Sequence, residues 1–317
     1  MPTASQLISL IKAHYESDEI RFSTVSLQIA AHEAKIGHKR LATDIQKTLD
    51  KAKTSKPVFK PLNKDLDGLV LETAPLYKLP ELIVSDSIQE RIQRIINEYI
   101  QVDKLRRHNL KNRRKIILSG DPGTGKTMTA SIIAHELNLP FYTILMDKMV
   151  TKYMGETSAK LRQVFDIIQS RQGVYLFDEF DAIGGQRGKD NDVGEMRRVL
   201  NSFLQFIERD NSESIIIAAT NNLDLLDQAL FRRFDDVLHY QLPSDEEKLL
   251  LLKNFLGRYN GSIDYKEILP LLNGLSHAEI SQVCMDSIKE CVLSDRKKID
   301  RVLLIKMIEN RKSAYKK

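Results

Sequence analysis

One stretch constrains the fold of this chain more than any other: Gly120 to Thr127, which reads GDPGTGKT. It matches the pattern G-x-x-x-x-G-K-[ST], with an apolar run at 115–119 before it and a helical pattern at 128–137 after it. A buried strand that enters a glycine-rich turn and then a helix is the context in which this pattern binds phosphate. The sequence therefore predicts a nucleotide site built on a strand, a loop and a helix.

The residue types of this loop match the chemistry of a nucleotide. Gly123 and Gly125 allow backbone N–H groups to converge on phosphate oxygens, and the helix N-terminus behind them favours the same anion. Lys126 offers a positive charge to the outer phosphates, and Thr127 can place its hydroxyl on Mg²⁺. We expect nucleotide contacts from the whole loop and the residue after it: Gly120, Asp121, Pro122, Gly123, Thr124, Gly125, Lys126, Thr127 and Met128.

A second group of polar residues follows the later strands and matches the needs of hydrolysis. One apolar run ends in two acids, of which Asp178 can join the Mg²⁺ shell and Glu179 can polarise the attacking water as general base. Asn221 ends the next strand, at the edge where open α/β sheets bind ligands. Arg232 and Arg233 precede the last strand and can stabilise charge on a phosphoryl group, within one chain or across an interface.

Composition restricts the class of protein. The 317 residues are 42% hydrophobic and 29% charged, which is typical of a soluble globular protein with two or three domains. No apolar run is long enough to span a membrane and the N-terminus is charged early, so we expect a cytoplasmic protein. Cys284 and Cys291 are the two cysteines, and their spacing on a helical pattern indicates buried, reduced residues rather than a disulfide.

Apolar runs alternate with helical patterns through the middle of the chain. We expect strands at 115–119, 141–145, 174–177, 215–219 and 237–242. Helices are expected at 87–109, 127–137, 158–170 and 193–208. The predicted fold class is therefore α/β: a P-loop NTPase parallel sheet flanked by helices, followed by an α-helical subdomain, with a small N-terminal helical unit.

The same patterns predict four regions. Residues 1–55 form a unit of three short helices that serves either assembly or recruitment of a partner or substrate, and 56–82 form a proline-containing linker with a short strand near 69–72. Residues 83–242 form the large nucleotide-binding subdomain. Residues 243–317 form a separate helical subdomain, with capping boxes of Ser with Glu at 244/247 and 276/279 and two further helices at 264–272 and 300–312.

Four ordered motifs resemble those of AAA+ ATPases, in the subgroup that contains the unfoldase, severing and membrane-remodelling machines. The similarity covers the chain from about residue 83 to its end. The motifs are GDPGTGKT at 120–127, YLFDEFDAIG at 175–184, IIIAATNNLDLLDQALFRRFD at 215–235 and GLSHAEI at 274–280. The resemblance implies ATP with Mg²⁺ as the cofactors and an ATPase activity.

The resemblance also implies a role for each matching residue. Lys126 and Thr127 take the Walker A role and Asp178 and Glu179 the Walker B role, with Thr127 and Asp178 at the metal. Asn221 is the first sensor. Arg232 and Arg233 are the two fingers that reach a neighbour's site. In such rings the C-terminal helical subdomain, here 243–317, is a lid that closes over the nucleotide. Its residues near adenine and ribose are Gly274, Ser276, His277 and Ala278. His277 stands where the subgroup usually has glycine.

The segment 152–156 resembles the first pore loop of such rings. Tyr153 and Met154 would grip a polypeptide through apolar contacts, and Gly155 would let the loop bend. The alternative is a tyrosine that packs the loop onto its own helix. Fingers that act in trans require a homo-oligomeric ring, usually a hexamer.

We therefore expect an ATP-driven ring that threads, unfolds or disassembles a protein substrate, as a chaperone or as the feeder of a separate protease. The alternative is a nucleic-acid-associated ATPase of the loader or initiator type, because 103–115 holds seven Lys or Arg against one acid. A solvated helix end and loop is the favoured interpretation of that basic segment. A third possibility, a nucleotide-gated scaffold, is opposed by the intact acids and arginines.

Overall fold

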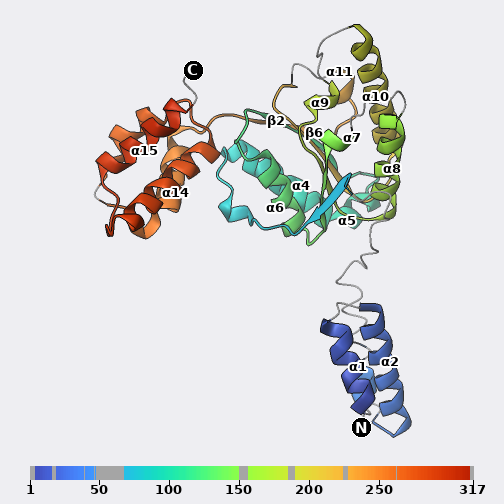
Figure 1. Cartoon of the computed structure of the whole chain (residues 1–317). Coiled ribbons are helices and arrows are strands. Elements are labelled where there is room, and N and C mark those ends of the chain that lie inside the picture. Colours follow the sequence, from blue (N-terminus) through green and yellow to red (C-terminus); the bar gives the residue numbers. More distant parts are fainter. Residues whose placement is uncertain are drawn as a thin grey trace. The chain divides into compact units, whose positions relative to one another are not determined.

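The structure is a computed structural model that describes residues 4–15, 19–38, 40–45, 47, 68–149, 156–184, 190–223, 228–261 and 263–314. The chain divides into two compact units, Met1–Leu62 and Asn63–Lys317 (Figure 1). In the described residues, no helix combines the length and the apolar character that crossing a membrane requires.

The first unit is helical. It contains α1 (Ala4–Tyr15) and α2 (Glu19–Lys35), and residues 40–45 are helical as well. Its described buried core is small, and its members are Ala13, Val25, Ile29, Ala30 and Ala42. On α1, Ile8 and Ile11 are more than half exposed.

The second unit is organised around a six-stranded sheet with the order β1-β3-β4-β5-β2-β6. Its strands are β1 (Val70–Thr73), β2 (Lys115–Gly120), β3 (Phe141–Ile144), β4 (Val174–Phe177), β5 (Ile215–Thr220) and β6 (Asp236–Tyr240). The five predicted strands are all present and parallel to one another. The short strand expected near 69–72 is β1, which pairs antiparallel with β3 and so adds an antiparallel edge to the predicted parallel sheet.

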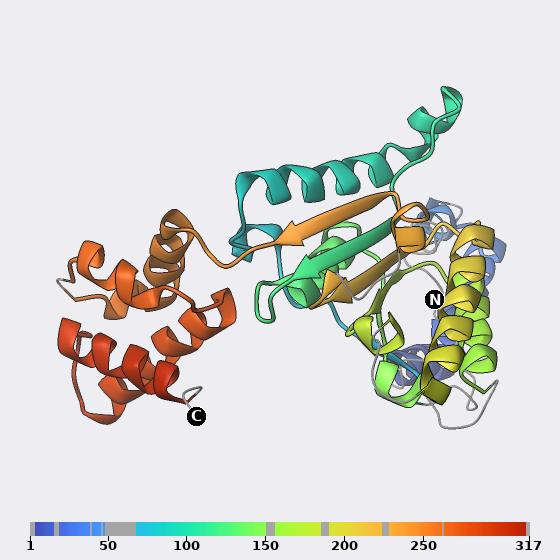
Figure 2. The ribbon, with the colours of Figure 1, turned by 90° about the horizontal axis from the view of Figure 1, so that it is seen from above.

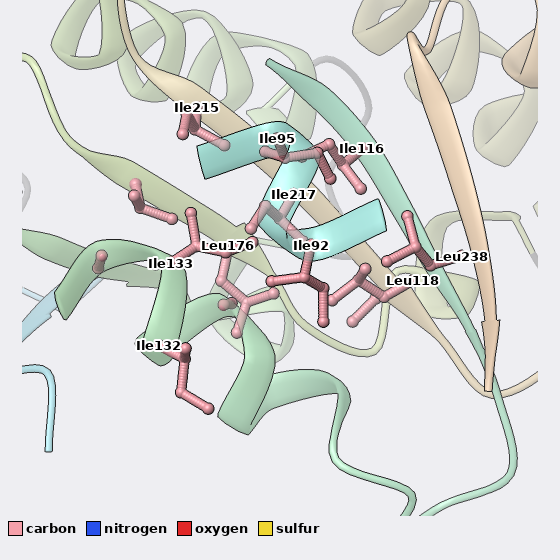
Figure 3. Packing of buried hydrophobic residues seen from close by; sticks show 14 of the residues in the cluster. Ile92, Ile95, Ile116, Leu118, Ile132, Ile133, Leu176, Ile215, Ile217 and Leu238 are labelled. Carbon is pink, nitrogen blue, oxygen red and sulfur yellow. The ribbon is translucent and has the colours of Figure 1, made fainter. Parts of the chain in front are cut away.

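Helices cover both faces of the sheet. On one face, α4 (Asp86–Ile100) and α6 (Lys126–Glu136) pack isoleucines against alternate residues of β2, β5 and β6 (Figure 3). On the other face, α8 (Glu156–Ser170) and α10 (Asp190–Arg209) supply aromatic rings. Phe177 of β4 lies 5.3 Å from Phe203 and 6.1 Å from Phe165, between ring centroids. This packing holds the strands whose carboxyl ends carry the candidate site.

The lid follows β6 directly, and Figure 2 shows β6, the orange arrow, running toward the helices that follow it. The lid contains α12 (Asp245–Leu256), α13 (Tyr265–Ile268), α14 (His277–Leu293) and α15 (Arg301–Ser313). Both predicted capping boxes are present at the starts of α12 and α14. Cys284 and Cys291 are buried and unbridged, as their spacing predicts.

Two predicted helices are interrupted. The helix expected at 87–109 breaks at Gln101 into α4 and α5 (Val102–Arg107), because α4 ends where its buried isoleucine stripe ends and Ile100 is already 64% exposed. The helix expected at 264–272 becomes α13 and a 3₁₀ turn (Leu269–Leu272), since Pro270 has no N–H for an α-helical bond. The remaining short elements are 3₁₀ turns Leu79–Glu81 and Gly257–Tyr259, α7 (Met146–Met149), α9 (Asp181–Gly184) and α11 (Gln228–Phe231).

Three arginines of the basic segment form ion pairs with other parts of the chain. Arg106 pairs with Glu213 at 2.6 Å, and Arg113 pairs with Glu98 at the same distance. Arg114 pairs with the carboxylate of Asp210, whose side chain is fully buried. These arginines join α5 and the loop before β2 to α4 and to the segment after α10, which supports the structural interpretation of the basic cluster.

Candidate nucleotide-binding site

The phosphate loop connects the end of β2 to the start of α6, as its sequence predicts. Gly120 needs to be glycine because a Cβ there would lie 2.1 Å from the carbonyl oxygen of Tyr240 on β6. Gly123 has a φ of +75° and Gly125, the residue before α6, a φ of +103°, which are left-handed conformations. The loop therefore folds over the end of β2 in a shape that other residues would strain.

Lys126 lies under this loop with 7% of its surface exposed. Its Nζ donates hydrogen bonds to the carbonyl oxygens of Gly120 at 2.8 Å and Asp121 at 2.9 Å. Burial lowers the pKa of Lys126, and the nearby carboxylates of Asp178, Asp121 and Asp181 oppose that shift. A phosphate oxygen entering the loop is an ionic acceptor, which an ammonium group binds more strongly than it binds carbonyls.

Thr127 and Asp178 meet although they are far apart in sequence. Thr127 is in the first turn of α6, and Asp178 follows β4 directly. The Thr127 hydroxyl donates a hydrogen bond to Oδ2 of Asp178 at 2.8 Å. Neighbouring ligands of an octahedral Mg²⁺, each about 2.1 Å from the metal, lie about 3 Å apart. The two oxygens therefore have the chemistry and separation that fit two adjacent positions of a magnesium ion.

Glu179 has an unusual backbone for a glutamate. Its φ is +51°, in the left-handed region, and its N–H donates to Oδ1 of Asp178 at 3.0 Å. Such a conformation costs a residue with a Cβ about 1–2 kcal/mol. The side chain is exposed, whereas Phe180 on the next position is fully buried. The turn presents a carboxylate to solvent beside Asp178, where the sequence predicts the general base.

Asn221 and Asp181 lie together at the ends of β5 and β4. The Thr220 hydroxyl donates to Oδ1 of Asp181 at 3.3 Å, and the backbone N–H of Asn221 lies 3.5 Å from the same oxygen. Asp181 therefore ties the predicted sensor to the acidic segment. Sequence reasoning did not single out Asp181, although its position three residues after Asp178 was an available signal.

The two arginines are not equivalent. Nε of Arg233 pairs with Glu208 of α10 at 2.8 Å, and its side chain is 28% exposed. Arg232 is exposed and has no ion pair with any residue that the structure describes. Arg233 is thus paired within the fold, whereas the side chain of Arg232 is exposed to solvent.

The lid contacts the phosphate loop through the start of α14. The N–H of Ala278 donates to the carbonyl oxygen of Gly123 at 3.0 Å, and a Cβ on Gly123 would lie 2.7 Å from Oγ of Ser276. His277 is 91% buried, and neither ring nitrogen has a hydrogen-bond partner in the described part of the chain. Burial lowers the pKa of His277. Gly274 begins this turn with a φ of +84°.

Comparison with known proteins gives the same family. The model for the ATPase family associated with various cellular activities (AAA) matches residues 116–242. The uncharacterized AAA family ATPase y4kL of Sinorhizobium fredii is 32% identical over 302 residues, which are 93% of this chain and 91% of that protein. The chain belongs to the AAA family of ATPases. It accordingly binds nucleotide and hydrolyses ATP.

Two further relatives of this AAA ATPase are longer. A proteasome-activating nucleotidase of Methanoregula boonei is 33% identical over 61% of this chain and 47% of its own length. The 26S proteasome regulatory subunit 10B homolog A of Arabidopsis thaliana is 27% identical over 84% of this chain and 70% of its own length. The chain thus spans about half of the nucleotidase.

The expected pore loop of the AAA ATPase lies outside the described residues. Tyr153, Met154 and Gly155 fall between α7 and α8, and α8 begins at Glu156, immediately after them. The order of loop and helix matches the resemblance, and the role of these three residues stays a prediction.

The contact between lid and phosphate loop gives a test. Gly123→Ala adds a Cβ that strains the left-handed backbone and displaces Ser276, so we expect ATP affinity to fall about tenfold. Gly257→Ala is the matched control, because Gly257 has a φ of +44° and open space around it. Isothermal titration should show weakened binding for the first variant alone. Equal ATP affinity in both variants would mean that the contact plays no part in binding.

Proposed function

We propose that this AAA ATPase is a cytoplasmic motor that works as a homo-oligomeric ring, a hexamer, and threads or unfolds a protein substrate for a separate protease. The observation that carries the proposal is the similarity to proteasome-activating nucleotidases over 61% of the chain. The exposed position of Arg232 supports the ring, because an exposed arginine is accessible to the site of a neighbouring chain.

The residues at the strand ends have the following proposed roles. Thr127 and Asp178 hold Mg²⁺, which when bound neutralises charge on the phosphates. Lys126 exchanges its carbonyl acceptors for the outer phosphate oxygens, and the N–H groups of the loop bind the same anion. Glu179 removes a proton from the attacking water, and Asn221 orients that water or the terminal phosphate.

The lid turn holds the nucleoside. Ser276 and Ala278 already contact Gly123 of the phosphate loop, so the lid responds to what that loop binds. His277, whose ring nitrogens have no hydrogen-bond partner among the described residues, gives the adenine and ribose a hydrogen-bonding group where glycine is usual. Gly274 supplies the left-handed backbone from which the turn starts.

Two other functions fit less well. A nucleic-acid loader needs accessible positive charge, and three arginines of the basic segment are committed to Glu213, Glu98 and Asp210. A scaffold that only binds nucleotide would not need a glutamate held in a strained backbone beside the metal ligands.

Tyr153→Ala is expected to keep ATP hydrolysis and to lose most work on a protein substrate. An aromatic ring supplies the apolar grip on a polypeptide, whereas the nucleotide site does not need it. Unfolding of a fluorescent protein with an unstructured tail measures the effect, and Tyr153→Phe is the control that retains the ring. Normal unfolding by Tyr153→Ala would assign the residue to packing of its own loop.

The proposal as a whole is tested by measuring ATPase rate against protein concentration, with unfolded protein, single-stranded DNA or double-stranded DNA added in turn. Mass photometry of Glu179→Gln with ATP gives the size of the assembly. A ring whose turnover rises with unfolded protein supports the motor. Stimulation by DNA alone would favour the loader, and a monomer that responds to none of the three would refute the self-sufficient ring.

A further inference from the structure

A serine and a histidine are paired directly behind the phosphate loop. Oγ of Ser119 lies 2.8 Å from Nδ1 of His239. Ser119 is the residue before Gly120 and is 2% exposed, whereas His239 is exposed on β6. The proposed hydrolysis mechanism uses neither residue, and they belong to no motif of the sequence analysis.

The pair continues a row of polar side chains across the sheet. Ser119 is in register with Thr220 on one side and with His239 on the other, and partners in a parallel sheet point to the same face. Thr220 donates to Asp181, which also approaches the N–H of Asn221. The row therefore connects the acidic segment after β4 to the strand that leads into the lid.

The histidine also borders a cavity of about 570 Å³ that is open to solvent next to the loop. This cavity is lined by Ser119, Gly120, Asp121, Asn221, Asn222, Leu223, His239, Tyr240, Gln241 and Leu242. The proposed sensor Asn221 and the phosphate-loop residue Asp121 thus face the same space as His239.

Ser119 and Gly120, which we call the root of the phosphate loop, contact β6 at two points. Gly120 lies so close to the backbone of Tyr240 that a Cβ there would clash, and Ser119 shares a hydrogen bond with His239. The carbonyl oxygen of Gly120 is one of the two that hold Lys126. Hydrolysis demands placement of the reacting groups to within fractions of an ångström, so a bond that fixes this root has a kinetic consequence.

We propose that His239 is a positioning residue for ATP hydrolysis. Through its hydrogen bond to Ser119 it fixes the position of the root of the phosphate loop and the shape of the cavity beside Asn221. The proposal rests on the roles assigned above to Lys126 and Asn221. His239 does not touch the reacting atoms in this scheme. Its loss lowers the rate of the chemical step and leaves ATP binding nearly unchanged.

The test uses the full-length chain and its ATPase activity without added protein substrate. His239→Ala and Ser119→Ala should each lower kcat about three- to tenfold with KM for ATP changed less than twofold, the range expected for one lost hydrogen bond. Because both remove the same bond, the double variant should be no slower than either single variant. Gln241→Ala, which lines the same cavity with no bond to Ser119, should keep the parent rate.

Two conservative variants separate positioning from packing. The amide of His239→Asn occupies the place of Nδ1 and can bond Ser119, whereas the amide of His239→Gln extends toward the place of Nε2. Asparagine should restore most of kcat and glutamine should not. Additive single variants, an unchanged kcat in His239→Ala, or equal rescue by both amides would overturn the proposal. Since no protein substrate is involved, a failure of the proposed motor function would leave this result intact.

Discussion

Glu179→Gln should bind ATP as well as the parent chain and hydrolyse it more slowly by on the order of 10²–10⁴. An amide keeps the size of the side chain and the left-handed backbone, but it does not take a proton from water at neutral pH. The Mg²⁺ ligands proposed here, Thr127 and Asp178, are untouched. Single-turnover hydrolysis measures the chemical step, and titration with a fluorescent nucleotide measures the affinity.

Glu179→Asn is the control that separates strain from chemistry. Asparagine also lacks the base, but it adopts a φ near +51° more readily than glutamate does. Its thermal midpoint should therefore lie above that of Glu179→Gln while hydrolysis stays low in both. Turnover near the parent rate in Glu179→Gln would remove this residue from the role of base.

Arg232→Ala should lower hydrolysis by on the order of 10³ and leave ATP affinity largely intact, because a finger acts on charge that develops during phosphoryl transfer. Arg233→Ala is its matched control. The Arg233–Glu208 pair lies partly in solvent, so its loss should cost less than about 1 kcal/mol of folding stability. Steady-state ATPase assays and thermal melts of both variants give the comparison.

A mixing experiment tests whether Arg232 acts on a neighbour. Rings mixed from Arg232→Ala and Glu179→Gln contain sites in which an intact Glu179 meets an intact Arg232 from the adjacent chain. Activity should then exceed that of either variant alone. A mixture no more active than its parts would exclude action in trans, and equal loss in both arginine variants would contradict their separate roles.

The strands and the phosphate loop were predictable because their signals are local. Apolar runs bounded by glycine and polar residues gave all five parallel strands to within one or two residues, and the capping boxes placed the starts of α12 and α14. The meeting of Thr127 with Asp178 also followed from the topology, because parallel strands end at one edge.

Other features depend on contacts between distant residues and leave no local pattern. The antiparallel pairing of β1 is decided by the free edge of β3, and the different positions of Arg232 and Arg233 are decided by Glu208 on α10. The bond between Ala278 and Gly123 joins the lid to the loop. Neighbouring residues of identical type cannot reveal which of them has a partner elsewhere in the fold.

The edge strand β1 gives the sheet a mechanical attachment point. The chain leaves the N-terminal unit, passes through 63–67 and enters the sheet at Val70, where the backbone of β1 is bonded along β3. β3 leads through α7 to the segment that holds Tyr153. Tension applied to the chain before Val70 would therefore act as shear on the hydrogen bonds between β1 and β3, the strand that leads into α7.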